Sequence, residues 1–253
     1  MDETLRQFWA PFVGAVSLTF DDGCDSQLEK AIPWLEERGF RGTFFPSSRV
    51  LSAPEKSAPW QRAAAAGHEI GNHTWSHTCS ANFTGSGGLE EWTLADIEQD
   101  ILRQQELLVG LFPDQAAWTF AYPCYQTDVG RGLGRQSYVP VVARHFLAGR
   151  GWGQGPFGNH PRAIDLALVW GTPVERMSGM EMIGVVETEA ALGKWTVLVF
   201  HEIQGHRLSV CGEDFKMLLD HLDRARDRIR TDTFGSVARR IADHQEKGRN
   251  RSA

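Results

Sequence analysis

The sequence predicts a single-domain α/β protein in which parallel strands form a barrel. Three observations favour this class. Apolar runs of strand length alternate with amphipathic stretches of helical period, which is the rhythm of a parallel sheet. The 253 residues contain no internal repeat and no low-complexity linker, so we expect one domain over residues 1–253. Acidic and histidine side chains follow predicted strands, and in α/β barrels catalytic groups gather at the carboxyl ends of the strands.

The first strand is expected over Val13–Phe20, a largely apolar run. Asp21, Asp22 and Gly23 follow it directly. Neighbouring side chains of a strand point to opposite faces, so both carboxylates can reach one ion only where the strand ends and the backbone turns. Gly23 is the expected turn residue. For this motif alone, a loop whose Asp caps the following helix is the more common role.

The other elements follow from the hydrophobic period and from capping residues. Thr93 is expected to cap the longest helix of the first half, which runs to Leu111. The run Tyr138–Ala143 is expected to be a barrel strand, and the glycine-rich segment 144–162 a loop that borders the same barrel face. In chain order, the remaining expectations are a helix over 26–38, a strand over 41–45, a helix over 59–66, a strand over 116–120, a strand beginning at Asp165, a helix over 178–192, a strand over 197–200, helices over 211–230 and 234–245, and a frayed basic tail over 247–251.

Three histidines complete a possible site. His73 and His77 lie four residues apart, and His201 ends the strand 197–200. Two imidazoles and one carboxylate bind a divalent ion such as zinc and leave room for water and substrate. A second carboxylate beside the ion can accept a proton from attacking water. Each motif is weak alone, because paired histidines are often polar loop residues, but their joint presence in chain order favours a metal site.

Together these motifs resemble those of a known family, the polysaccharide deacetylases, also called the NodB homology domain or carbohydrate esterase family 4. The resemblance covers most of the chain, from residue 13 to residue 203. It rests on the segments Thr19–Gly23, Gly67–His77 and Val197–His201. The resemblance implies a distorted (β/α) barrel of about seven strands.

The resemblance also implies roles for individual residues. Asp21 would be the general base, and His201 would be the general acid that protonates the leaving group. Asp22, His73 and His77 would bind a divalent metal ion. Zn²⁺ is the first expectation for this ion, with Co²⁺, Ni²⁺ or Mn²⁺ as alternatives.

A third family motif, Arg-Pro-Pro-Tyr-Gly, supplies an arginine that orients the base and a backbone amide that stabilises the oxyanion. Here the matching segment is Ala121–Tyr125, so Ala121 stands in place of the arginine and the Cys124 amide takes the oxyanion role. Because a buried Asp beside a cation needs charge balance, we expect a replacement arginine near Asp21. Arg144 is the candidate, and a solvated surface arginine, or one that binds acidic groups of a substrate, is an equally open interpretation of it.

Nine tryptophans are a high count, and indole rings stack on the flat C–H faces of sugars. Trp75 lies between the two metal histidines, and Trp152 lies in the glycine-rich segment. Both are expected sugar contacts, together with Tyr125 of the third motif. The alternative is core packing or loop anchoring, which accounts for most tryptophans.

The resemblance implies metal-dependent removal of acetyl groups from N-acetylated amino sugars in poly- or oligosaccharides. An O-acetyl esterase acting on acetylated polysaccharide such as xylan is an open alternative, because the same site can expel an alkoxide. A divergent sugar-binding module with little turnover is a third interpretation, motivated by Ala121. The expected partner is an acetylated carbohydrate, and the oligomeric state is left open.

Composition excludes some other classes. The formal net charge of −6 argues against a nucleic-acid surface and against binding to anionic membranes. No window is long and apolar enough for membrane insertion, and residues 1–6 lack a leader pattern. A cytoplasmic location is therefore expected if the chain is full length, and a secreted or cell-envelope location if it has been trimmed. The four cysteines, Cys24, Cys79, Cys124 and Cys211, are expected to be free thiols of a reducing compartment.

Overall fold

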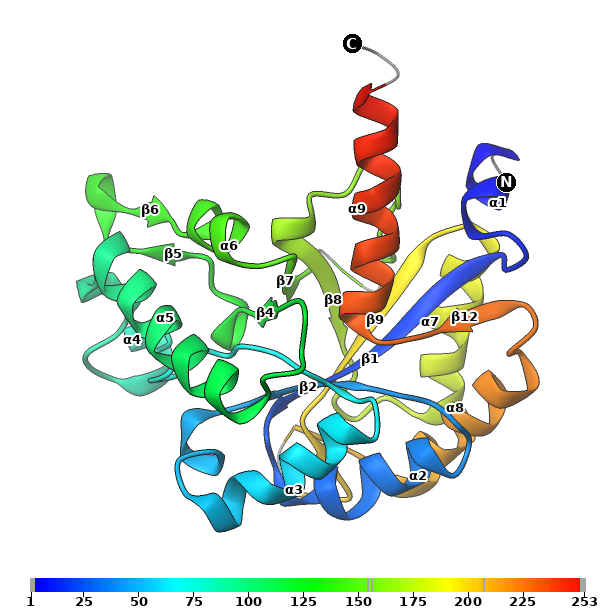
Figure 1. The fold of residues 1–253 in the computed structure, drawn as a ribbon, viewed down its shortest axis with the longest axis horizontal. Coiled ribbons are helices and arrows are strands. Elements are labelled where there is room, and N and C mark those ends of the chain that lie inside the picture. The colour runs from blue at the N-terminus through cyan, green and yellow to red at the C-terminus, as the bar shows by residue number, and fades with distance from the viewer. Residues whose placement is uncertain (1–2, 154, 156, 207, 251–253) are drawn as a thin grey trace.

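Parallel strands form a nearly closed barrel in the computed structural model, which describes residues 3–153, 155, 157–206 and 208–250 (Figure 1). The barrel strands are β1 (Gly14–Asp22), β2 (Thr43–Pro46), β3 (Glu69–Ile70), β4 (Thr119–Ala121), β7 (Ala148–Trp152), β8 (Val169–Pro173) and β9 (Trp195–Phe200). Their order is β3-β2-β1-β9-β8-β7-β4, and every neighbouring pair is parallel. A further strand, β12 (Ile229–Thr231), pairs in parallel with the first residues of β1.

The two edges of this strand order meet at Asn72. Asn72 forms a parallel bridge with Phe120 of β4. The Asn72 amide donates to the Thr119 carbonyl, and the Ala121 amide donates to the Asn72 carbonyl, each over 2.9 Å. The predicted barrel of about seven strands is therefore confirmed.

Helices cover the outside of the barrel and close one of its ends (Figure 1). The helices are α1 (Glu3–Trp9), α2 (Ile32–Glu36), α3 (Pro54–Ala65), α4 (Ala81–Thr84), α5 (Leu94–Leu111), α6 (Val139–His145), α7 (Gly179–Ala191), α8 (Gly212–Arg224) and α9 (Phe234–Asn250), and the short strands outside the barrel are β5 (Asp128–Val129), β6 (Gln136–Ser137), β10 (Glu202–Ile203) and β11 (Ser209–Val210). Thr93 and Ser178 begin α5 and α7 with reciprocal capping boxes, as the sequence predicts for Thr93. None of the helices in the described part of the chain combines the length and the apolar content that crossing a membrane requires.

The alternation of side chains along β1 positions the site. Val16 and Phe20 point outward and pack in the core between the strands and their covering helices. Ser17 and Asp21 lie on the opposite face, inside the barrel, where the Ser17 hydroxyl accepts a hydrogen bond of 3.0 Å from the Trp195 indole. The barrel interior is therefore filled below Asp21, and Asp21 lies at the carboxyl end of its strand.

Helix α9 closes the amino end of the barrel. Its first residue, Phe234, packs against Trp195 at the start of β9, with 5.1 Å between the ring centroids. The partly buried Glu69 carboxylate accepts a hydrogen bond of 2.7 Å from the Gly235 amide of the first turn of α9. Burial raises the pKa of Glu69 in spite of the hydrogen bonds that its carboxylate accepts. The carboxyl end of the barrel is left for the functional site.

Two expectations about the middle of the chain are wrong. Residues 139–145 form helix α6 instead of a strand, because Pro140 suits the first turn of a helix and a short apolar run cannot distinguish a strand from a buried helix. The segment 144–162, expected to be a loop, contains barrel strand β7. Its glycines serve close packing: a Cβ on Gly149 would lie 2.7 Å from the Ala167 carbonyl oxygen.

Other boundaries differ by a few residues. The helix expected over 26–38 is a π-helical turn, Gln27–Ala31, followed by α2, and the helix expected over 59–66 begins earlier, at Pro54. The helix expected over 211–230 ends at Arg224, because β12 follows it. Asp165 does not begin a strand but caps the 3-10 turn Leu166–Leu168 that precedes β8. Helix α9 continues through Asn250 into the tail expected to be frayed, and Arg251 lies outside the described residues.

Candidate metal centre and catalytic site

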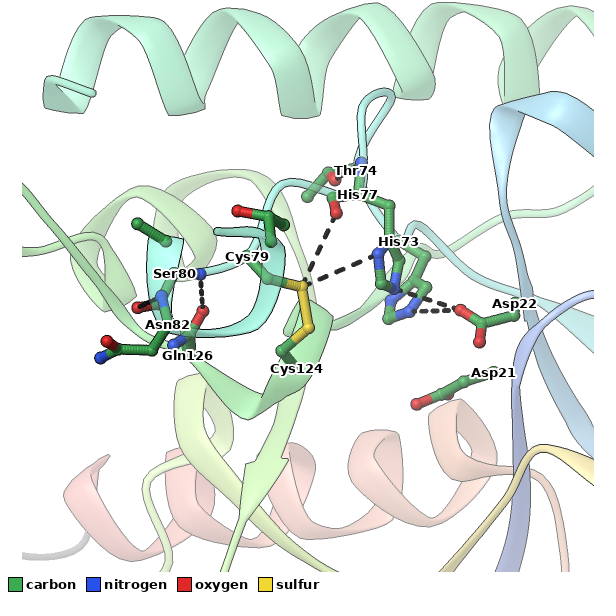
Figure 2. Close-up of a disulfide and its surroundings, with 12 residues drawn as sticks. Asp21, Asp22, His73, Thr74, His77, Cys79, Ser80, Asn82, Cys124 and Gln126 are labelled. Carbon is green, nitrogen blue, oxygen red and sulfur yellow. Dashed lines mark hydrogen bonds and ion pairs between the residues drawn. A yellow bond between two sulfur atoms is a disulfide. The ribbon is translucent and has the colours of Figure 1, made fainter. Parts of the chain in front are cut away.

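The paired carboxylates lie where β1 ends, as the sequence predicts. Asp22 and Gly23 both adopt left-handed backbone conformations, with φ of 72° and 78°. Gly23 is needed because a Cβ there would also lie 2.6 Å from the Val50 side chain. The turn directs the Asp22 carboxylate toward His73 and His77, as Figure 2 shows.

Asp22, His73 and His77 form a compact cluster of possible ligands. The Asp22 Oδ1 atom lies 3.5 Å from the His73 Nε2 atom and 3.1 Å from the His77 Nε2 atom. One ligand atom from each side chain lies within 4.8 Å of the others. Burial alone would raise the pKa of Asp22, but the two histidines outweigh it and hold that pKa far below its ordinary value.

The surroundings of His73 suit metal binding. This histidine is buried, and its Nδ1 atom lies 2.8 Å from the Ala121 carbonyl oxygen. A proton on Nδ1 would be donated to that oxygen, which leaves Nε2 free as a ligand and fixes the ring. Two imidazoles and one carboxylate match the ligand set of an open catalytic zinc site. The residues present therefore fit a divalent ion.

Asp21 is paired with Arg150, not with the expected Arg144. The Arg150 Nη2 atom donates to the Asp21 Oδ1 atom, and both side chains are buried. Arg144 lies in α6 at the surface, where it pairs with Glu98 over 3.1 Å. The prediction for Arg144 is wrong because it assumed a strand over 138–143, and the actual strand, β7, carries Arg150 instead.

Arg150 lies beside the position where the third motif lacks its arginine. Ala121 of β4 and Arg150 of β7 are register partners on adjacent parallel strands. Gly171 of the next strand makes room for the long side chain, since a Cβ there would lie 2.8 Å from the Arg150 Cδ atom. Sequence reasoning missed Arg150 because the glycines around it favour a loop.

His201 follows β9 and faces Asp21. Its Nε2 atom lies 4.0 Å from the Asp21 Oδ2 atom, and its Nδ1 atom lies 3.3 Å from the Glu175 Oε1 atom. Burial would lower the pKa of His201, but the carboxylates of Glu175, Asp21 and Asp22 outweigh it and raise that pKa. Glu175 follows the end of β8 and was not predicted, although a carboxylate just past a strand end was the available signal.

Gln27 ties the ends of the two central strands together. Its side-chain amide donates to the Asp21 carbonyl over 2.5 Å and to the His201 carbonyl over 2.8 Å. Gln27 itself is fully buried. The backbones that carry Asp21 and His201 are therefore held at a fixed separation by a residue that no motif identified.

The third motif forms a tight turn joined to the histidine loop by a disulfide. Cys124 bonds to Cys79, with 5.9 Å between their Cα atoms (Figure 2). The prediction of four free thiols is therefore wrong for this pair, because sequence spacing does not show which distant cysteines the fold brings together. Cys24 and Cys211 are free, as expected. A reducing compartment can therefore no longer be inferred from the cysteines.

The expected sugar contacts lie in two places. Trp152 is 63% exposed at the end of β7, and its ring centroid is 6.4 Å from that of Tyr125. The Arg150 guanidinium lies 5.7 Å from the Tyr125 ring centroid, so these two aromatic rings adjoin the Asp21 pair. The Trp75 ring is instead covered by the Arg103 guanidinium, 3.9 Å from the ring centroid. All three sugar contacts stay predictions.

The fold and the site define a class: α/β barrels with a candidate metal centre at the carboxyl ends of their strands. The sequence profile of the family described as "Polysaccharide deacetylase" matches residues 13–129, which include Asp21, Asp22, His73 and His77. Together with the relatives below, this match supports a polysaccharide deacetylase of carbohydrate esterase family 4.

Individual relatives agree with this assignment. The chain is 36% identical over 87 residues to chitin deacetylase 1 of Cryptococcus neoformans var. grubii, which covers 33% of this chain and 18% of that protein. Among solved structures it is similar to the peptidoglycan deacetylase PdaC of Bacillus subtilis, with a TM-score of 0.57 and 17% identity, covering 94% of this chain and 96% of the other. It is also similar to a family 4 acetyl xylan esterase from Clostridium thermocellum in complex with a cobalt ion, with a TM-score of 0.55 and 19% identity, covering 88% and 89% of the two chains. The matched stretches span only 5% to 26% of the length of the curated relatives.

Proposed function

We propose that this protein is a metal-dependent hydrolase that removes acetyl groups from N-acetylated amino sugars in poly- or oligosaccharides. The observation that carries the proposal is the cluster of Asp22, His73 and His77, whose ligand atoms lie within 4.8 Å of one another. Asp21 and His201, the expected base and acid, lie beside this cluster, each with a charged partner of its own. Zinc is the expected ion, with cobalt, nickel or manganese as alternatives.

Asp22, His73 and His77 would hold the ion. When bound, it would polarise the acyl carbonyl and make a water molecule a better nucleophile. Asp21 accepts the proton of the attacking water, and Arg150 keeps the Asp21 carboxylate in one orientation through their hydrogen bond. The Cys124 amide donates a hydrogen bond to the oxygen that becomes negative.

His201 completes the reaction as the general acid. Its raised pKa favours the protonated imidazole, which donates its proton to the departing amino nitrogen. The Glu175 carboxylate, 3.3 Å from the Nδ1 atom, stabilises the imidazolium by its charge. The charged partners suit this division of roles, because an arginine stabilises the negative charge of the Asp21 carboxylate and a carboxylate stabilises the positive charge of a protonated His201.

The substrate sugar is proposed to stack on Trp152 and Tyr125. Trp152 is the more exposed of the two. The Tyr125 hydroxyl and the Nε and Nη1 atoms of Arg150 are buried and have no hydrogen-bond partner among the described residues. Buried polar atoms of this kind call for polar groups of a substrate or for ordered water. Hydroxyl and acetamido groups of a sugar would supply them.

An O-acetyl esterase acting on acetylated xylan is the second candidate. The observation in its favour is the similarity to an acetyl xylan esterase. A sugar-binding module with little turnover is the weaker alternative, because a binder would not need the Asp21–Arg150 and His201–Glu175 pairs. The disulfide favours an oxidising compartment, as expected of a secreted or cell-envelope protein, over the cytoplasm.

The test is acetate release by the zinc-loaded protein from N-acetylated chitooligosaccharides and from acetylated xylan, each with and without a chelator. Release from the chitooligosaccharides, abolished by the chelator and restored by added zinc, supports the proposal. Release from xylan alone would favour the esterase. Release from neither substrate by protein that contains the metal would reject both hydrolases.

A further inference from the structure

The Cys79–Cys124 disulfide joins two loops that carry different parts of the proposed machinery. Cys79 lies two residues after the ligand His77, and Cys124 itself contributes the expected oxyanion amide. The two cysteines are 45 residues apart in sequence. Figure 2 shows the bond beside the imidazoles that face Asp22. The covalent link therefore fixes the distance between a ligand loop and the proposed oxyanion loop.

The orientation of the His77 ring depends on the disulfide more than the orientation of the His73 ring does. The Nδ1 atom of His73 lies 2.8 Å from the Ala121 carbonyl oxygen. The Nδ1 atom of His77 has only the Cys79 sulfur, at 3.9 Å, as a hydrogen-bonding contact among the described residues. A histidine that binds metal is normally oriented by an oxygen acceptor on its second nitrogen. The disulfide sulfur occupies the place of that acceptor at His77.

The backbone near both cysteines is strained. His77, Cys124 and Tyr125 adopt left-handed conformations, with φ of 51°, 50° and 58°. Residues with side chains rarely adopt this region, and they persist there only where the surrounding structure fixes them. The His77 amide has one such support, because it donates to the Thr74 hydroxyl over 3.0 Å. A covalent bond between the two strained turns supplies a further constraint.

We propose that the Cys79–Cys124 disulfide is a positioning element for catalysis, which holds His77 and the Cys124 amide at the separation that turnover needs, so that its reduction lowers turnover reversibly. The proposal rests on the proposed function above. A phosphine reductant transfers two electrons to the S–S bond, which breaks, and is itself converted to the phosphine oxide with oxygen from water. The protons of that water complete the two thiols.

The fold would keep the two thiols near each other after reduction. The Ser80 amide, next to Cys79, donates to the Gln126 side-chain oxygen over 2.5 Å. Gln126 lies two residues after Cys124, so this hydrogen bond is a second tie between the same loops. After reduction the two loops would be more mobile but would stay close together. The Cys79 and Cys124 thiols could therefore form the disulfide again.

The experiment compares the zinc-loaded full chain before and after treatment with a phosphine. Thiol counting with a maleimide confirms reduction, and metal content is measured in both states. Acetate release gives kcat and KM, and amide hydrogen exchange is followed over residues 73–79 and 122–126. A double variant, Cys79→Ala with Cys124→Ala, reproduces the open bond without a reductant. Cys211→Ala, which changes an exposed free cysteine, is the matched control and is expected to keep the response to the phosphine.

Reduction and the double variant are expected to lower kcat by about 10- to 100-fold with metal retained, since a displacement of about 1 Å costs that much. Exchange should become faster in both loops, and reoxidation should restore kcat. The proposal is overturned if exchange in the two loops is unchanged, or if kcat survives reduction. It is also overturned if kcat falls only in step with metal content. If the oxidised protein releases no acetate, the proposed function is wrong whatever the disulfide does. In that case amide exchange still tests the disulfide, because unchanged exchange in the two loops after reduction would show that the bond does not constrain them.

Discussion

Arg150→Ala is expected to remove most of the activity while leaving the metal site intact. Arg150 donates to Asp21, and the two side chains are 0% and 4% exposed. Removing one partner of a buried ion pair leaves the other charge uncompensated, which costs about 3 to 5 kcal/mol of folding free energy. In a chain of this length that loss corresponds to a fall in Tm of about 6 to 20 °C.

The catalytic effect of the same substitution acts through the position of the base. General acid–base catalysis contributes about 10²- to 10⁴-fold, and a base free to rotate loses much of it, so we expect kcat to fall by about 10²-fold. Arg150 contacts none of Asp22, His73 or His77 in the described hydrogen bonds and ion pairs, so metal content should be unchanged. Acetate release and metal analysis below the lowered Tm measure both quantities.

Two further variants make this prediction sharp. Arg144→Ala is the matched control, because Arg144 is an exposed arginine paired with Glu98, and such pairs contribute about 0 to 1 kcal/mol. Returning the arginine to its register partner, by combining Ala121→Arg with Arg150→Ala, should restore part of kcat. The reasoning is refuted if Arg150→Ala keeps the wild-type kcat, or if Arg144→Ala loses as much activity as Arg150→Ala does.

The remaining predictions concern the metal and the proton transfers. His73→Ala should lose both bound metal and activity, whereas Asp21→Asn should keep the metal and lose kcat; metal analysis beside acetate release would contradict the assignment if both variants kept their metal. Glu175→Gln should lower the pKa of His201, since the Glu175 carboxylate helps to raise it. Because the acid is active below its pKa and inactive above it, the alkaline limb of kcat should move to lower pH. A pH profile that does not move would mean that His201 is not the acid.

The sequence predicts the barrel well because its signals are local. The apolar run of β1 and the capping residue of α5 determine secondary structure through residues close to them in the sequence. Both elements lie where expected. The largest errors in secondary structure fall at 138–152, where local signals conflict with packing. Valine-rich α6 has the composition of a strand, and β7 has the glycines of a loop because neighbouring residues approach its backbone closely. Only the assembled sheet shows those approaches.

The residues of the site also fall into those that local sequence motifs identify and those that they do not. Asp21, Asp22, His73 and His77 lie in short motifs, so their residue types and spacing are enough to indicate a metal centre. Their partners do not lie in such motifs. Arg150 and Glu175 come from different segments and meet the motif residues only through the arrangement of the barrel strands, whereas Gln27 lies six residues after Asp21 and reaches His201 across the sheet. Residues that strand pairing brings together have no fixed separation in the sequence, so no sequence motif identifies them.

The distribution of backbone strain explains why this site needs so many partners. Asp22, Thr74, His77, Cys124 and Tyr125 all have positive φ, and each such residue costs on the order of 1 to 3 kcal/mol. Strain of that size relaxes unless other contacts oppose it. The Gln27 side-chain amide, which joins the β1 and β9 backbones, opposes the strain at the loop after β1. The Cys79–Cys124 disulfide opposes it at the histidine loop and at the turn of the third motif. Loosening any one of these ties should therefore disturb proton transfer and oxyanion binding before it unfolds the barrel, whose core is packed independently of them.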